Sequence, residues 1–177
     1  MEDINVIAHF KPSILGGELS SVSSKSSAHR ALICAALADG CSKIENLLFS
    51  EDICATIHAL NALGAKFEKK KNSVCVHGIS SVPPSAVFDC NESGSTLRFL
   101  IPIAAALGVS AEFHGSGRLP QRPITPYLDC LTPKGIYFDY QQTMPFSIRG
   151  KLKSGIYQIP GNISSQFITG LLFALPL

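Results

Sequence analysis

The chain has 177 residues, of which 46% are hydrophobic and 16% are charged, and its formal net charge at pH 7 is +2. This balance predicts a globular chain with a sizeable core and argues against disorder. The small net charge does not indicate a nucleic-acid or membrane surface, and the apolar runs are shorter than the ~20 residues that a membrane span needs. We therefore expect no nucleic-acid or membrane partner, and a cytoplasmic location, since the acidic N-terminus does not resemble an export signal.

Six cysteines and five histidines bear on redox state and metal binding. The cysteines form no C-x-x-C pair, and we expect them to be reduced packing residues. The histidines are scattered, without the spacing typical of metal ligands. The sequence therefore predicts no metal site.

The first strongly patterned segment is an apolar helix expected over residues 25–38, ending at Gly40. Weak strand signals precede it at residues 4–10 and 17–22. Four serines lie at its start together with Lys25 and Arg30. A helix N-terminus has unpaired N–H groups and a partial positive charge, so this segment is a candidate anion-binding corner.

Residue spacing excludes two known anion-binding or catalytic motifs for this segment. A P-loop needs glycine directly before the lysine and again five residues earlier, where this chain has Ser24 and Leu19. A Ser-x-x-Lys nucleophile needs serine at position 22, which is valine. Plain helix capping by the serines remains an alternative to ligand binding.

The next elements form a pattern that recurs. A second helix is expected after Ser50, ending at Gly64, and a hairpin of residues 65–68 and 74–77 follows it. The same order returns as helices over 92–108 and 125–135 and a hairpin of 136–138 and 146–148. Serine-bearing helix starts lie near Ser26, Ser95 and Ser164. These spacings indicate units of about seventy residues, of which the third stops after its first helix, so we expect the chain to be the front part of a longer protein.

Two further segments contribute candidate anion contacts. Gly94, in the second serine-bearing corner, would let a ligand approach the backbone closely. Arg122 lies in a proline-bounded loop, and a guanidinium group suits bidentate contacts with carboxylate or phosphate. A tight turn at Gly94 and a structural salt bridge at Arg122 are the alternatives.

Four motifs in this order resemble the 5-enolpyruvylshikimate-3-phosphate (EPSP) synthase family, over nearly the whole chain from about Lys11 onward. They are Ser24-Lys25-Ser26 with Arg30, residues 92–98, residues 118–124, and Ser164-Ser165-Gln166-Phe167. The resemblance is to the N-terminal part of a much longer enzyme. It implies an α/β fold of repeated βαβαββ units, with helices inside and sheets outside, that is incomplete here.

The resemblance also implies a domain division. Residues 1–22 would belong to the domain that the C-terminal half completes, and residues 23–177 to the N-terminal domain. The units of that domain would cover residues 23–80, 85–150 and 155 onward. The active site would lie in the cleft between the two domains.

Residue roles follow from the resemblance by position. Shikimate 3-phosphate would contact Lys25, Ser26, Arg30, Ser164, Ser165 and Gln166. Phosphoenolpyruvate would contact Lys25, Gly94, Arg122 and Gln166. Lys25, which contacts both substrates, is the candidate catalytic residue within this chain.

The reaction implied is carboxyvinyl transfer between these two anions, without a cofactor, by an enzyme expected to be a monomer. Because the family's acid and base groups lie mostly in the C-terminal half, we expect this chain alone to be inactive. Glu92 replaces the asparagine common in the family, and we expect its carboxylate to point away from the ligands. The alternatives are a UDP-N-acetylglucosamine enolpyruvyl transferase and a non-catalytic anion-binding module.

Overall fold

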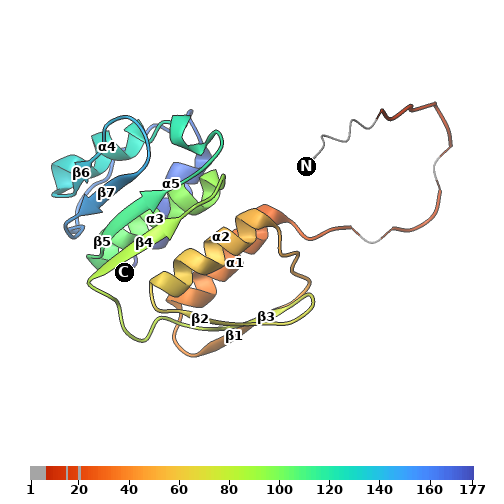
Figure 1. Cartoon of the computed structure of the whole chain (residues 1–177), viewed down its shortest axis with the longest axis horizontal. Helices are drawn as coiled ribbons and strands as arrows, with labels where there is room; N and C mark the ends of the chain where they lie inside the picture. The colour runs from red at the N-terminus through yellow and green to blue at the C-terminus, as the bar shows by residue number, and fades with distance from the viewer. Residues whose placement is uncertain (1–6, 15, 20) are drawn as a thin grey trace.

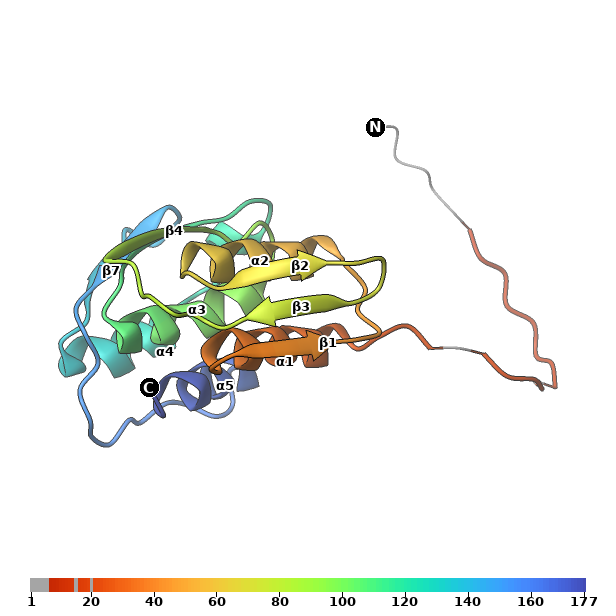
Figure 2. The same ribbon diagram turned by 90° about the horizontal axis from the view of Figure 1, so that it is seen from below.

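The computed structural model describes residues 7–14, 16–19 and 21–177. From Lys25 onward, this part of the chain forms two β-sheets with helices packed against them and between them (Figure 1). In Figure 2 the first sheet lies in front of helices α1 (Lys25–Leu37) and α2 (Glu51–Ala62), and the described residues before α1 extend away from the sheets and helices. None of the described helices is both long enough and apolar enough to cross a bilayer.

The first sheet is antiparallel throughout, in the order β1-β3-β2. The β2–β3 hairpin and the helices α1 and α2 were predicted from the sequence, whereas β1 was not predicted. Val74 and Val76 are buried on the face that α1 and α2 cover. The elements of this unit are α1 (Lys25–Leu37), β1 (Cys41–Ile44), α2 (Glu51–Ala62), β2 (Lys66–Lys69) and β3 (Val74–His77).

The second sheet has the order β4-β5-β7-β6, with β4 parallel to β5 and the other pairs antiparallel. Its elements are β4 (Ser85–Asp89), α3 (Gly94–Leu107), β5 (Ser110–His114), α4 (Thr125–Leu131), β6 (Tyr137–Asp139) and β7 (Phe146–Arg149). Short 3-10 helices flank α4 at Leu119–Gln121 and Thr132–Lys134. The unit is therefore a complete βαβαββ arrangement, as predicted.

The repeat is visible in both sheets and helix starts. Strands β1-β3-β2 and β5-β7-β6 have the same order and the same antiparallel pairing. Helices α1, α3 and α5 (Ser165–Ala174) begin after the N-cap residues Ser24, Ser93 and Ser164. The predicted serine-bearing helix starts near Ser26, Ser95 and Ser164 are thus confirmed.

The core is organised around α3. Eleven of its fourteen residues are buried, so it packs on all sides, against α1, α2 and α5 as well as the second sheet. Gly108 ends it in the left-handed conformation at φ 75°, where glycine avoids the steric cost of a Cβ atom. By contrast α1, although its sequence is also largely apolar, leaves Ser27, Ala31 and Cys34 exposed.

The two expected N-terminal strands are not found in the described residues. Residues 7–10 and the described part of 17–22 form no strand, and residues 4–6 and 20 lie outside the described range. A strand requires a neighbour to bond its N–H and C=O groups, and Ile7, Phe10 and Leu19 are almost fully exposed instead. Helix α1 also ends earlier than predicted, because Ala38 is its C-cap and Gly40, at φ 82°, lies in the turn to β1.

Candidate anion-binding site

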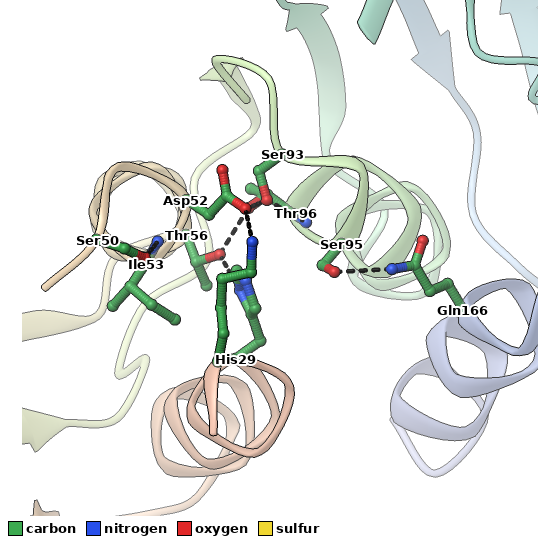
Figure 3. Close-up of polar contacts among 10 residues, drawn as sticks. His29, Ser50, Asp52, Ile53, Thr56, Ser93, Ser95, Thr96 and Gln166 are labelled. Carbon is green, nitrogen blue, oxygen red and sulfur yellow. Dashed lines mark hydrogen bonds and ion pairs between the residues drawn. The ribbon is translucent and has the colours of Figure 1, made fainter. Parts of the chain in front are cut away.

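Four helices present their N-termini toward one region, each capped by a serine. The hydroxyl oxygens of Ser24, Ser50, Ser93 and Ser164 accept hydrogen bonds from backbone N–H groups in the first turns of α1, α2, α3 and α5. Figure 3 shows the four helices nearly end-on, with polar side chains meeting between them. Capping thus explains these four serines, and it leaves Ser26 and Ser165 exposed in the first turns of α1 and α5.

Lys25 lies at the start of α1, facing α2. Its Nζ donates to Oδ2 of Asp52, in the first turn of α2, at 2.6 Å. Because the Lys25 side chain is still 58% exposed, it remains accessible to a ligand while Asp52 restricts its position. No local sequence pattern indicates this pairing, because Lys25 and Asp52 are 27 residues apart.

Arg30 connects α1 to α5. Its Nη1 donates to the carbonyl oxygen of Ser26 at 2.8 Å, and its Nη2 lies 3.5 Å from Oγ1 of Thr169. Thr169 in turn donates to the carbonyl oxygen of Ser165 at 3.0 Å. The guanidinium carbon also lies 5.6 Å from the centre of the Phe99 ring, within cation–π range. These contacts hold Arg30 beside the exposed first turns of both helices.

Gln166 joins α5 to α3. Its Oε1 accepts from Nη1 of Arg98 at 2.7 Å, and its Nε2 donates to Oγ of Ser95 at 2.8 Å (Figure 3). Arg98 lies 4.9 Å above the Phe167 ring. The side chain of Gln166 is therefore fixed in orientation by two partners 68 and 71 residues away in the sequence.

Arg122 and Arg98 both approach Gly94. A methyl group at Gly94 would lie 2.6 Å from Nη1 of Arg122 and 3.4 Å from Nη1 of Arg98. Burial, and secondarily the Arg122 cation, lower the pKa of the Arg98 guanidinium from its usual value. In the described part of the chain neither guanidinium pairs with a carboxylate, and the buried Nε of Arg98 has no hydrogen-bond partner. Two neighbouring uncompensated cations favour a bound anion at this position.

Glu92 lies close to these cations in the sequence, but its carboxylate contacts the loop after β5. Oε2 of Glu92 lies 3.5 Å from the backbone N–H of Arg118, and a Cβ atom at Gly117 would overlap the carboxylate group. Glycine at position 117 therefore leaves room for the Glu92 side chain.

A buried polar network connects α1, α2 and α3 behind Lys25. The Nδ1 atom of His29 lies 2.7 Å from Oγ1 of Thr56, which is 2.6 Å from Oγ1 of Thr96. Thr96 donates to Oγ of Ser93 at 2.7 Å (Figure 3). All four side chains are buried. Because buried polar groups are costly unless bonded, this network determines how the three helices pack together.

We predict that His29 makes stability fall in mild acid. Burial lowers the pKa of His29 from 6.5 to about 4, since its Nε2 has no partner in the described residues. The unfolded chain takes up a proton near pH 6.5 and the folded chain only near pH 4, so stability is lost as pH falls between these values and the loss levels off below. The shift corresponds to about 3 kcal/mol at most.

Urea unfolding at pH 7 and pH 4.5, combined with an NMR titration of the His29 ring, checks this prediction. His29→Asn removes the titrating group and is expected to lose less stability between the two pH values than the wild type does. His58→Asn, at an exposed position, is the matched control. A His29 ring that titrates near 6.5 in the folded protein would contradict the prediction.

The structure thus brings the predicted residues together along one continuous set of contacts. Lys25, Ser26 and Arg30 lie at the start of α1, Arg30 reaches α5 beside Ser165, and Gln166 reaches α3. The side chain of Arg122 lies against Gly94, at the start of α3. The residues that sequence reasoning missed are Asp52, Arg98 and Thr169. Arg98 is part of the motif over residues 92–98, whereas the sequence had no signal for Thr169.

Comparison with solved structures identifies the fold. The EPSP synthase of Acinetobacter baumannii matches with a TM-score of 0.78 at 28% identity, over 89% of this chain and 37% of that chain. The enolpyruvyl transferase NikO of Streptomyces tendae matches with a TM-score of 0.50 at 16% identity, over 84% of this chain and 36% of that chain. The fold is that of the enolpyruvyl transferases, which confirms the predicted fold class.

Sequence comparison narrows this class to one family. The model of EPSP synthase (3-phosphoshikimate 1-carboxyvinyltransferase) matches residues 10–177. The 3-phosphoshikimate 1-carboxyvinyltransferase of Clostridium beijerinckii is 49% identical over 175 residues, which cover 94% of this chain and 40% of the relative. The chain belongs to the EPSP synthase family and spans about 40% of the length of the curated relatives it matches.

Proposed function

We propose that this chain supplies one side of the active site of an enzyme that makes EPSP. That enzyme transfers the carboxyvinyl group of phosphoenolpyruvate to the 5-hydroxyl of shikimate 3-phosphate and releases phosphate, in the shikimate pathway to aromatic amino acids. The observation that carries the proposal is the convergence of Arg98 and Arg122 on Gly94 without a carboxylate, next to Lys25, Arg30 and the N-termini of four helices.

The shikimate 3-phosphate subsite is formed by α1 and α5. Two exposed first turns supply free N–H groups and hydroxyls, and Arg30 lies between them, held by Thr169. A phosphate dianion there would receive charge-assisted hydrogen bonds, which are stronger than bonds between neutral groups. We assign this subsite to Lys25, Ser26, Arg30, Ser164, Ser165 and Gln166.

The phosphoenolpyruvate subsite is formed by α3 and the loop that carries Arg122. Because Gly94 has no side chain, the guanidinium groups of Arg98 and Arg122 lie directly against the start of α3, where an anion would meet both cations and helix N–H groups. We assign this subsite to Lys25, Gly94, Arg122 and Gln166, with Arg98 fixing the orientation of Gln166.

The chemistry follows from bringing two anions together. The 5-hydroxyl oxygen attacks C2 of phosphoenolpyruvate and loses its proton, while the methylene carbon gains a proton and becomes a methyl group. Loss of a proton from that methyl group and departure of phosphate then restore the vinyl group. The cations and helix N-termini offset the repulsion between the substrates, so that much of the catalysis in this half of the site is positioning and electrostatic stabilisation. Lys25, held by Asp52, is the candidate catalytic residue. The reaction requires no cofactor.

The rest of the site would come from a second domain. We propose that residues 23–177 form part of the N-terminal domain and that residues 1–22 belong to the second domain, with the substrates bound between the two. The exposure of Ile7, Phe10, Ile14 and Leu19 supports this division, because a group of large apolar side chains is normally buried against another part of the functional protein. We further propose a monomeric, cytoplasmic enzyme.

Isothermal titration calorimetry of the purified chain tests the proposal. We expect binding of shikimate 3-phosphate that weakens as salt is raised, because the contacts are ionic. We also expect no release of phosphate when phosphoenolpyruvate is added. Binding of UDP-N-acetylglucosamine in place of shikimate 3-phosphate would favour the sugar-specific transferase. Measurable turnover would contradict the expected inactivity of this chain, and indifference to both ligands would contradict the proposed site.

A further inference from the structure

A second cluster of reactive side chains lies on the outer face of the first sheet, away from the site described above. Cys41 is the first residue of β1, and Cys75 and His77 are in β3. Cys41 follows the C-terminal end of α1, whereas Lys25 and Arg30 lie at or near its N-terminal end. The cluster is therefore independent of the anion-binding site.

Strand register explains why these three residues meet. Cys41 pairs with His77, and Lys43 pairs with Cys75, so Cys41 and Cys75 are diagonal neighbours on adjacent strands. Side chains alternate between the faces of a strand, and Val74 and Val76 are the buried ones in β3. Cys75 and His77 therefore share the outer face, where Cys41 is exposed.

The distances suit a single bound cation. The Sγ atoms of Cys41 and Cys75 are 2.8 Å apart, and these two atoms and a ring nitrogen of His77 all lie within 4.8 Å of one another. Zinc binds thiolate at about 2.3 Å and imidazole at about 2.0–2.1 Å, so tetrahedral ligand atoms lie roughly 3.3–3.8 Å apart. Side-chain rotations of Cys41, which is exposed, and of the partly exposed Cys75 and His77 would move the two sulfurs apart and bring the three donors to this spacing.

The carboxylate of Glu68 lies beside the histidine of this cluster. Oε1 of Glu68, on the neighbouring strand β2, lies 3.4 Å from Nε2 of His77. A carboxylate beside a ligating histidine commonly orients the ring and raises its basicity. Cys41, Glu68 and His77 also line a surface hollow, so that an ion has access from solvent. The other residues of its lining are Gly40, Gly64, Lys66, Gly78 and Ser80.

We propose that Cys41, Cys75 and His77 form a binding site for a thiophilic divalent cation of the zinc type, with Glu68 positioning His77. Two thiolates neutralise the charge of the ion, and soft sulfur and imidazole donors select zinc over magnesium or calcium. The expectation of no metal considered only spacing along the sequence, and antiparallel pairing brings together ligands that are 34 and 36 residues apart. The bound ion would link β1 to β3 and stabilise the sheet.

A disulfide between the two cysteines is the competing outcome, because their Sγ atoms are only 2.8 Å apart; the usual Cα spacing of diagonal strand neighbours argues against it. Diagonal neighbours in an antiparallel pair have Cα atoms about 7–8 Å apart, whereas a disulfide usually needs about 4.4–6.8 Å. A metal ion spans the longer separation, because each sulfur bonds to the ion and not to the other sulfur.

The test is zinc binding by the reduced, chelator-treated 177-residue chain, measured by competition with a chromophoric chelator. We expect one zinc ion per chain, and a thiolate charge-transfer band when cobalt replaces zinc. Cys41→Ser, Cys75→Ser and His77→Ala should each lower the zinc affinity by at least about 100-fold, and Glu68→Gln by about 10-fold. Cys34→Ser, which changes an exposed cysteine outside the cluster, is the matched control and should bind as the wild type does.

Three results would overturn the proposal. One is zinc affinity that Cys41→Ser leaves unchanged, and another is equal loss in Cys34→Ser, which would indicate nonspecific thiol binding. The third is a Cys41–Cys75 disulfide that forms in air even with excess zinc present. Shikimate 3-phosphate binding, measured on the same variants, should not change, so the result is independent of the proposed enzymatic function.

Discussion

Arg30→Ala is expected to weaken the binding of shikimate 3-phosphate by about 30- to 100-fold. A hydrogen bond to a charged group contributes about 1.5–3 kcal/mol, and Arg30 is the cation between the exposed first turns of α1 and α5. The variant also loses the contact with Thr169 and the packing on Phe99. Calorimetric titration of the wild type and the variant measures the effect.

Two further variants separate the charge of Arg30 from its shape. Arg30→Lys keeps the charge but loses the planar fork, so it should recover only part of the affinity. Lys71→Ala removes an exposed cation in the β2–β3 turn and should leave binding unchanged at moderate salt. Equal losses in Lys71→Ala and Arg30→Ala would mean that only net charge matters, and would contradict a specific phosphate contact.

Gly170→Ala is expected to cause the largest loss of stability, about 3 kcal/mol or more, or to prevent folding. Gly170 lies where α5 crosses α3, and an added methyl group would overlap the hydroxyl of Tyr127 and lie 2.5 Å from the backbone oxygen of Arg98. The Tyr127 hydroxyl is itself fixed, lying 2.6 Å from the oxygen of Arg98 and 2.9 Å from that of Phe167. The backbone oxygen of Arg98 cannot move aside as the end of a flexible side chain can. Helices α3 and α5 must therefore move apart.

Urea unfolding of Gly170→Ala measures this loss, with Gly161→Ala as the matched control. A methyl group at Gly161 would meet only Cδ1 of Ile168, at 3.8 Å, which is ordinary contact. If Gly170→Ala is too unstable to purify, Tyr127→Phe should still unfold at lower urea than the wild type, because it removes the hydroxyl that hydrogen-bonds between the backbones of α3 and α5. Wild-type stability in both variants would show that α3 and α5 do not pack as described.

Local chemistry explains which elements were predictable. Helices α1, α2, α3 and α5 each start at a capping serine and carry long apolar patterns, and the β2–β3 hairpin has clear alternation around a polar turn. Strands β1, β4 and β5 are not joined to their partners by a tight turn, so no local hairpin pattern indicated them. Their strand character depends on pairing with β3, with each other and with β7.

The candidate site divides in the same way. Motifs named five of the site residues, which are Lys25, Arg30, Gly94, Arg122 and Gln166. A helix start with hydroxyls and cations can be recognised from a few consecutive residues. Their substrate roles remain predictions. The pairing of Lys25 with Asp52 and the support of Gln166 by Arg98 join residues 27 and 68 positions apart, so no local pattern indicates them.

The sequence by itself determined where the main helices begin, the repeat of about seventy residues and the family, because capping, periodicity and motifs are properties of neighbouring residues. By contrast, the meeting of Arg98 and Arg122 at Gly94, and of Cys41 and Cys75 beside His77, became known from the folded chain alone. Those meetings depend on helix packing and strand register, which are set by contacts between segments far apart in the chain.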